Sequence, residues 1–430
     1  MDYFVVEGPT PLRGTVRAAG AKNAALPLMA AAMLAEGRSV LANLPDLRDT
    51  RFFLDLLGEM GVRGELDGGT LTLDTTGGLT STTAPYEIVR KMRASIYVLG
   101  PLLAVRGEAR VSRPGGCAFG PRPVDLHERG MAALGAELAE EHGYIVARAP
   151  RGGLRGGRFR FDPVSVGATC NVLMAAVLAR GESRLENCAI EPEVTQLVEA
   201  LVAAGAHIEG AGTRTLEVQG VASLTPLEVA VIPDRIEAGT YLAAAAIAGG
   251  EVRVEGCRAG HMAPILAVLR DLGCKVTEHA DDDDKAAAAE EAITCARTGP
   301  LAPVRVETQP FPGFPTDMQA QIMAAAALAD GVSFVTDTIY PDRFTHAAEL
   351  VRLGARIEVK NGTATIIGTE RLQAAPVMAS DLRASAALVL AAAAAHGCTE
   401  IRRVYHIDRG YERIEHRLTS LGARITRASE

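Results

Sequence analysis

Six segments of the chain repeat one pattern of apolar and polar positions. Each segment begins with charged or small polar residues and continues as an Ala- and Leu-rich run that is apolar on nearly all sides. A Gly then follows, and after it a stretch in which apolar and polar residues alternate. Such a run predicts a helix buried on every side, and the alternation predicts a short strand. The predicted helices begin at Lys22, Arg93, Gly167, Glu237, Asp317 and Arg383, roughly 65 to 80 residues apart.

A second, more amphipathic helix follows each of these strands. It ends in a signature such as MGV, LGA, AGA or LGC, whose Gly suits a helix C-terminus because the left-handed conformation is common there. Runs such as GTLTLDT, GYIVARA, RTLEVQG and GTATIIG then predict further strands. Helix, Gly turn, strand and second Gly recur in register, which favours a true repeat over chance similarity among Ala-rich helices.

The repeat and the chain length together predict the fold class. Three units that pack their buried helices together inside sheets form one α/β domain, so six units predict two similar α/β domains. A chain of 430 residues also exceeds the size at which one hydrophobic core usually keeps growing. With 48% hydrophobic and 22% charged residues, the chain is expected to be globular.

The composition of the chain argues against nucleic acids and membranes as binding partners. A formal charge of -8 argues against a nonspecific nucleic-acid binder, and 4% aromatic residues without Trp argue against a stacking platform for single strands. The start MDYFVVEG lacks the basic flank and apolar core of a signal peptide. The longest apolar stretch, residues 384–395, is well short of the roughly 20 residues needed to cross a bilayer. We therefore expect small-molecule substrates, no nucleic acid and no membrane association.

The cysteines indicate a reducing compartment. Seven cysteines without CxxC spacing fit neither a disulfide framework nor a zinc site, so we predict a cytoplasmic protein without a metal. Five of them lie in or beside apolar segments and are predicted to be buried: Cys170, Cys188, Cys257, Cys274 and Cys398.

Cys117 lies instead in a Gly- and Pro-rich loop, RPGGCAFGPRPVDL, with Arg113 and Arg122 nearby. Neighbouring cations lower the pKa of a thiol and make it more reactive, so Cys117 is a candidate catalytic residue. The alternative is an ordinary Gly-Pro turn with an incidental cysteine.

Charged residues at the predicted helix starts suggest an anionic ligand. Ser, Asp, Asn and Glu at these positions are explained by helix capping alone. Lys22, Arg93 and Arg383 are not, because a cation at a helix N-terminus opposes the helix dipole. If the buried helices are parallel, their N-termini converge on one end of each domain and suit a phosphate or carboxylate. Arg409 lies just before another amphipathic helix, where the alternative is a solvated face.

Eight segments of the sequence resemble the UDP-N-acetylglucosamine 1-carboxyvinyltransferase family of enolpyruvyl transferases. They are AGAKNAALP, MRASIYVLGPL, GGCAFGPRPVDLH, VSVGAT, PDRIEAGTY, PGFPTDMQAQ, ASDLRASAALVLA and YHIDRGYERIE. The resemblance spans nearly the whole chain. It implies two inside-out α/β barrel domains of three repeats each, with the active site in the cleft between them. The implied domains are residues 22–230, which carry the Cys117 loop, and residues 1–21 plus 231–430.

The resemblance also implies a reaction. The enolpyruvyl group of phosphoenolpyruvate passes to the 3'-hydroxyl of UDP-N-acetylglucosamine with release of phosphate, the first committed step of peptidoglycan biosynthesis. By motif, Cys117 is the general acid, is the target of fosfomycin and can hold a covalent phosphoenolpyruvate adduct, and no cofactor is required. Asp317 accepts the hydroxyl proton. Lys22, Arg122 and Arg409 surround the phosphate and carboxylate of phosphoenolpyruvate.

The remaining implied site residues are assigned by motif in the same way. Those that hold the UDP-sugar are Asn23, Arg93, Arg122, Pro123, Val124, Asp125, Leu126, Ser165, Val166, Gly167 and Ile339. Arg343, Asp381 and Arg383 are expected to act in closure or to support the residues that touch substrate. The related enzyme that uses shikimate 3-phosphate, and a catalytically silent paralogue that binds UDP-sugar, stay as alternatives. The acidic insert around residues 281–285 is expected to be a solvated loop and is assigned no function.

Overall fold

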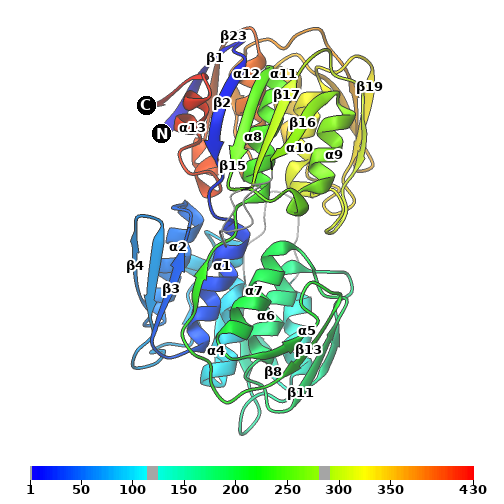
Figure 1. Cartoon of the computed structure of the whole chain (residues 1–430). Helices are drawn as coiled ribbons and strands as arrows, with labels where there is room; N and C mark the ends of the chain where they lie inside the picture. Colours follow the sequence, from blue (N-terminus) through cyan, green and yellow to red (C-terminus); the bar gives the residue numbers. More distant parts are fainter. Residues whose placement is uncertain (1, 114–123, 280–290) are drawn as a thin grey trace. The chain divides into compact units, whose positions relative to one another are not determined.

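The computed structural model describes residues 2–113, 124–279 and 291–430 of the chain (Figure 1). The chain folds into two compact units. The first unit comprises the described residues of Gly20–Cys117 and Pro121–Ile232, and the second those of Met1–Ala19 and Pro233–Glu430. Each unit has its own cluster of buried hydrophobic side chains. The acidic insert and residues 114–123 of the Cys117 loop lie outside the described residues.

Three Ala-rich helical segments form the centre of the first unit. Most of their side chains are buried, as a run that is apolar on all sides predicts. They are α1 (Lys22–Ala31) with the 3₁₀ turn η1 (Ala32–Leu34), η2 (Arg93–Val98) with α4 (Leu99–Arg106), and α6 (Val166–Ala176). The other helices of this unit are α2 (Arg48–Glu59), α3 (Tyr86–Val89), α5 (Asp125–Ala133) and α7 (Pro192–Ala203).

Three four-stranded sheets complete the described part of the first unit. The first has the order β14 (Glu228–Ala230), β3 (Arg38–Ala42), β5 (Thr70–Asp74), β4 (Arg63–Asp67). The second has the order β6 (Thr83–Ala84), β7 (Glu108–Ser112), β9 (Tyr144–Arg148), β8 (Glu137–Glu141). The third has the order β10 (Arg158–Arg160), β11 (Glu182–Glu186), β13 (Thr215–Gln219), β12 (His207–Glu209).

The second unit repeats this plan. Its buried helices are α8 (Arg235–Ala248), η4 (Thr316–Met318) with α10 (Gln319–Ala326), and α12 (Leu382–Ala394), and these three helices contact one another. The more peripheral helices are η3 (Ala259–His261), α9 (Ala263–Asp271), α11 (Thr345–Arg352), η5 (Val404–Arg409) and α13 (Ile414–Ser420).

The sheets of the second unit, within the residues described, have the same form. The first has the order β16 (Cys274–His279), β17 (Ala292–Arg297), β15 (Gly250–Glu255), β2 (Leu12–Arg17). The second has the order β18 (Arg305–Glu307), β19 (Val332–Thr336), β21 (Thr363–Ile367), β20 (Arg356–Lys360). The third has the order β22 (Val377–Met378), β23 (Gly397–Arg402), β1 (Asp2–Gly8), β24 (Arg424–Ser429).

One pairing rule holds in all of these sheets. The strand that follows a buried helix pairs in parallel with an edge strand and antiparallel with its other neighbour, as β3 does with β14 and β5. Two edge strands pair in the sheet of one unit but directly precede, in the chain, the first buried helix of the other unit. Strand β2 directly precedes α1 but pairs with β15 of the second unit, and β14 directly precedes α8 but pairs with β3 of the first unit.

The predicted repeat is confirmed, and with it the α/β fold class. The Gly that ends each second helix has a left-handed backbone, with φ between 87° and 103°: Gly61, Gly135, Gly205, Gly273, Gly354 and Gly422. One prediction is wrong. Cys398 is exposed, because it lies on the outward face of β23, while its neighbour Thr399 points inward. Among the described residues, no helix combines the length and apolar character required to cross a membrane.

Candidate functional site

In the first unit, the described candidate residues lie at the starts of four helical segments. Lys22 and Asn23 begin α1, and Arg93 begins η2. Val124, Asp125 and Leu126 lie at the start of α5, and Ser165, Val166 and Gly167 at the start of α6. Cys117, Arg122 and Pro123 lie outside the described residues.

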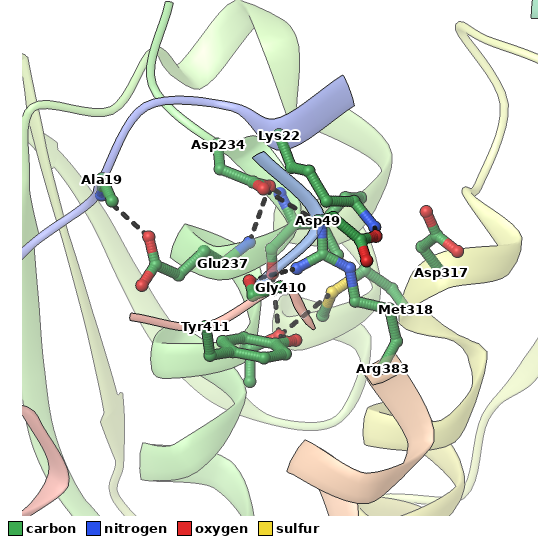
Figure 2. A network of polar contacts seen from close by, with 12 residues as sticks. Ala19, Lys22, Asp49, Asp234, Glu237, Asp317, Met318, Arg383, Gly410 and Tyr411 are labelled. Atoms are coloured by element: carbon green, nitrogen blue, oxygen red, sulfur yellow. Dashed lines mark hydrogen bonds and ion pairs between the residues drawn. The ribbon is translucent and has the colours of Figure 1, made fainter. Parts of the chain in front are cut away.

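Lys22 is held at the start of α1 by an acidic partner from the next helix. The residue is 9% exposed, and its Nζ donates a hydrogen bond of 3.1 Å to Oδ2 of Asp49, a buried residue in the first turn of α2 (Figure 2). A buried ammonium is costly unless it is paired, so Asp49 stabilises Lys22 in its charged form. A cation therefore remains at the N-terminus of α1, where it can bind an anion.

A fixed histidine faces the start of α6. Oδ1 of Asn171 accepts from the backbone N of Gly100 at 2.7 Å, so Nδ2 of Asn171 is the atom that lies 2.9 Å from Nδ1 of His127. Nδ1 must then accept, and a neutral His127 carries its proton on Nε2. Burial, with a contribution from Arg93, lowers the pKa of His127 to about 3, so the ring is neutral at physiological pH.

The Nε2–H of His127 lies against the first turn of α6. A Cβ placed on Gly167 would meet Cε1 and Nε2 of His127 at 3.4 Å. At the same turn, Oγ of Ser165 caps the helix by accepting from N of Ala168 at 3.2 Å. Helix N–H groups and a neutral imidazole donor thus gather at one place, an arrangement suited to a phosphate.

In the second unit, Arg343 links two candidate carboxylates. Its Nη1 donates to Oδ1 of Asp317 at 2.6 Å, and its Nε lies 3.6 Å from Oδ2 of Asp381. Burial alone would lower the pKa of Arg343, but the charges of Asp317 and Asp381 raise it above its ordinary value. The permanently charged guanidinium stabilises Asp317 as an anion, the form that can accept a proton.

Asp381 and Asp234 cap two neighbouring buried helices. Oδ1 of Asp381 accepts from the backbone N of Arg383 at 2.6 Å at the start of α12. Oδ1 of Asp234 accepts from N of Ile236 at 2.8 Å and N of Glu237 at 3.0 Å at the start of α8. Both side chains are thereby fixed by helix N–H groups, as expected for aspartate at an N-cap.

Arg383 is the buried centre of this network (Figure 2). It is 2% exposed, and its Nη2 lies 3.0 Å from Oδ2 of Asp234. Nη1 donates to the carbonyl O of Gly410 at 3.4 Å, and the guanidinium lies 5.1 Å from the ring centroid of Tyr411. The sequence pattern predicts a bound anion beside the cation at this helix start, whereas in the structure Asp234 supplies the compensating charge.

Glu237, in the first turn of α8, is buried beside Asp234. Its Oε2 accepts from the backbone N of Ala19 at 2.8 Å (Figure 2), and its Oε1 accepts from the hydroxyl of Tyr241 at 2.9 Å. Burial raises the pKa of Glu237 to about 7, against the opposing effect of Arg417, whose Nε lies 3.8 Å from Oε1. Glu237 therefore changes its charge near neutral pH.

Asp337 anchors the loop that carries Ile339. Its Oδ1 accepts from the backbone N of Ile339 at 3.0 Å, and its Oδ2 accepts from Oγ1 of Thr316 at 2.6 Å. Thr316 directly precedes Asp317 in η4, so one buried carboxylate holds both candidate segments. Arg409 is half-buried at the end of η5.

Several supporting residues are not among those predicted from the sequence. Asp234 precedes an apolar helical run and carries a recognisable N-cap signal, and Asp49 is an acidic residue in a first helical turn. Asn171 is a polar residue inside an apolar helix, and this polarity itself indicates that its side chain has a specific hydrogen-bond partner. The set consists of Asp49, His127, Asn171, Asp234 and Asp337.

Known enolpyruvyl transferases are similar to this chain over nearly its whole length. The family model for EPSP synthase (3-phosphoshikimate 1-carboxyvinyltransferase) matches residues 6–418. A UDP-N-acetylglucosamine 1-carboxyvinyltransferase of Anaeromyxobacter sp. (strain K) is 55% identical over 430 residues, covering 99% of each chain. One from Psychrobacter sp. (strain PRwf-1) is 50% identical and covers 100% of this chain and 97% of its own. The crystal structure of the enolpyruvyl transferase NikO from Streptomyces tendae has 26% identity and a TM-score of 0.87, covering 100% of this chain and 99% of its own.

Proposed function

We infer that this chain, which belongs to the UDP-N-acetylglucosamine 1-carboxyvinyltransferase family of enolpyruvyl transferases, transfers enolpyruvyl from phosphoenolpyruvate to the 3'-hydroxyl of UDP-N-acetylglucosamine. The observation that carries this proposal is the 55% identity over 430 residues to a relative of that name. The reaction releases phosphate and commits the sugar to peptidoglycan, so the proposed cellular roles are cell-wall biogenesis, cell shape and cell division. The proposed location is the cytoplasm, as the cysteine pattern indicates.

The proposed mechanism uses proton transfers to and from Cys117 and Asp317. Cys117 protonates C3 of phosphoenolpyruvate, which makes C2 electrophilic, and Asp317 takes the proton of the attacking 3'-hydroxyl. The tetrahedral adduct then loses phosphate from C2, which leaves with the proton held by Asp317, and a proton from C3, which returns to the Cys117 thiolate, so that the double bond is restored. The ion pair between Asp317 and Arg343 supports the assignment of Asp317 as the base, because an ionised carboxylate is required there.

The residues proposed to bind the two anionic substrates are charged in one case and neutral hydrogen-bond donors in the other. Lys22, Arg122 and Arg409 bind the phosphate and carboxylate of phosphoenolpyruvate, where charge-assisted contacts are strongest. Ser165, Gly167 and the Nε2–H of His127 are suited to the diphosphate of the UDP-sugar. The buried Lys22 to Asp49 pair supports the first assignment, and the Asn171 to His127 hydrogen bond supports the second.

A phosphate-release assay with two acceptors tests the function. We expect phosphate release when phosphoenolpyruvate is combined with UDP-N-acetylglucosamine and none when it is combined with shikimate 3-phosphate. Activity with shikimate 3-phosphate alone would support the related enzyme. If calorimetry detects binding of the UDP-sugar while no phosphate is released, the chain is a binding paralogue instead.

Labelling by the epoxide fosfomycin tests the special reactivity of Cys117. Only a thiolate opens the epoxide rapidly, and burial raises the pKa of Cys188 to about 12 and that of Cys257 to about 11. We therefore expect peptide mass spectrometry to find the adduct on Cys117. The exposed Cys398 is a built-in comparison: it should react with iodoacetamide but not with fosfomycin.

Two variants serve as controls for the labelling. Cys398→Ser should be labelled by fosfomycin to the same extent as the unaltered protein, and Cys117→Ala should not be labelled. An adduct on Cys398, or persistent labelling of Cys117→Ala, would show that the reactivity is not specific to the Cys117 loop.

A further inference from the structure

Arg409 lies in a short segment whose backbone needs external support. The segment η5 is bounded by Arg403, with φ of 60°, and the following turn ends at Arg413, with φ of 46°. Residues other than glycine rarely adopt this left-handed conformation, and they keep it only where surrounding contacts impose it. Asp408 and Gly410, the two neighbours of Arg409, both make such contacts.

Asp408 is bound by an arginine from the last strand of the chain. Nη2 of Arg427 lies 2.6 Å from Oδ1 of Asp408, and Nη1 lies 3.1 Å from Oδ2, so the two side chains form a bidentate pair. Such a fork fixes orientation as well as distance. Arg427 comes from β24, and it is itself fixed from two other sides.

The other partners of Arg427 come from α13 and β1. Its Nε donates to Oε1 of Glu415 at 2.8 Å, and its guanidinium lies 4.8 Å from the ring centroid of Phe4. Nη1 also lies 3.4 Å from Oδ2 of Asp2. Two further acidic side chains and one aromatic ring therefore hold this guanidinium against Asp408.

Gly410, on the other side of Arg409, is held by Arg383. The carbonyl O of Gly410 accepts from Nη1 of Arg383 at 3.4 Å, and the ring of Tyr411 lies beneath the same guanidinium (Figure 2). The hydroxyl of Tyr411 lies 2.9 Å from Oγ1 of Thr240 on α8. The segment is thus fixed at both neighbours of Arg409 by arginines that belong to different elements.

We propose that Arg427 is a positioning residue, which holds Asp408 so that Arg409 is oriented to bind phosphoenolpyruvate. This inference rests on the proposed function, which places Arg409 on the anionic donor. Arg427 itself touches no substrate in this proposal. It acts through Asp408, and its effect is confined to the substrate that Arg409 binds.

The test is a comparison of Arg427→Gln with Arg424→Gln in the phosphate-release assay. Arg424 lies on the same strand, is exposed, and pairs with Glu7 at 3.6 Å, away from η5. We expect Arg427→Gln to raise the KM for phosphoenolpyruvate by about 10- to 100-fold, because small misplacements of a binding group cost that much. The KM for UDP-N-acetylglucosamine should stay unchanged, and Arg424→Gln should match the unaltered protein in both constants.

Two further variants separate positioning from folding. Arg427→Lys keeps the charge but loses the fork, so its KM for phosphoenolpyruvate should be intermediate. Asp408→Asn leaves Arg427 paired with Glu415 and should raise the same KM, even if Arg427→Gln fails to fold. A KM for phosphoenolpyruvate that stays unchanged in Asp408→Asn, or a rise of both KM values together, would overturn the proposal. Absence of phosphate release by the unaltered protein would instead count against the proposed function.

Discussion

Replacing Cys117 with alanine is expected to abolish turnover. The methyl side chain cannot protonate C3 of phosphoenolpyruvate, and loss of a general acid typically costs about 10²- to 10⁴-fold in rate. Phosphate release under saturating substrates measures the loss. Binding of UDP-N-acetylglucosamine, measured by calorimetry, should persist, because the sugar is assigned to other residues.

The matched variant Cys117→Asp distinguishes acid catalysis from a purely structural role of the loop. A carboxylic acid can also donate a proton, so some activity should remain. An ordinary aspartate has a pKa of about 3.9, whereas a thiol has a pKa of about 8.5. The carboxyl group therefore carries its proton only at lower pH, so the pH optimum of Cys117→Asp should move toward acid. Full activity of Cys117→Ala at neutral pH would exclude the acid role.

Replacing Arg383 with methionine is expected to give the largest loss of stability. Met fills a similar apolar volume but leaves Asp234 buried without its cation, and breaking a buried pair in this way typically costs about 3–5 kcal/mol. At about 2–4 °C per kcal/mol for a unit of this size, the melting temperature should fall by about 6–20 °C in calorimetry.

Two comparisons make this prediction specific. Adding Asp234→Asn to Arg383→Met removes the uncompensated charge while keeping an N-cap oxygen, so the double variant should be more stable than Arg383→Met alone. Arg402→Gln breaks an exposed pair with Glu400 and should leave the melting temperature nearly unchanged. A fall in Arg402→Gln equal to that in Arg383→Met would show that burial is not the cause.

Local features of this chain could be predicted from the sequence, because they depend on neighbours in the chain. The all-apolar run of α12 predicts a buried helix wherever the helix packs. The Gly after Leu353 predicts a left-handed end to α11 from the local geometry of a helix terminus. Ser165 caps α6 as a polar residue before an apolar run is expected to do.

Pairings between distant elements could not be predicted in this way. Arg383 and Asp234 are 149 residues apart, and periodicity states which face a residue occupies but not which side chain it meets there. For the same reason, the pattern at the start of α12 indicates a bound anion and not Asp234. Cys398 shows a related limit, since an alternating strand places a small apolar residue on either face with no other signal.

The two ends of the chain are neighbours in one sheet, because β1 lies between β23 and β24 with Asp2 opposite Ser429. The ribosome produces β1 long before β24, so this sheet cannot be completed until residues 424–429 have been made. The first unit, whose described residues all fall between Gly20 and Ile232, has its strands much earlier and can fold while synthesis continues. Arg427 therefore reaches Asp408 only after β24 has been made, and a nascent chain that ends before Arg427 carries Arg409 without that support.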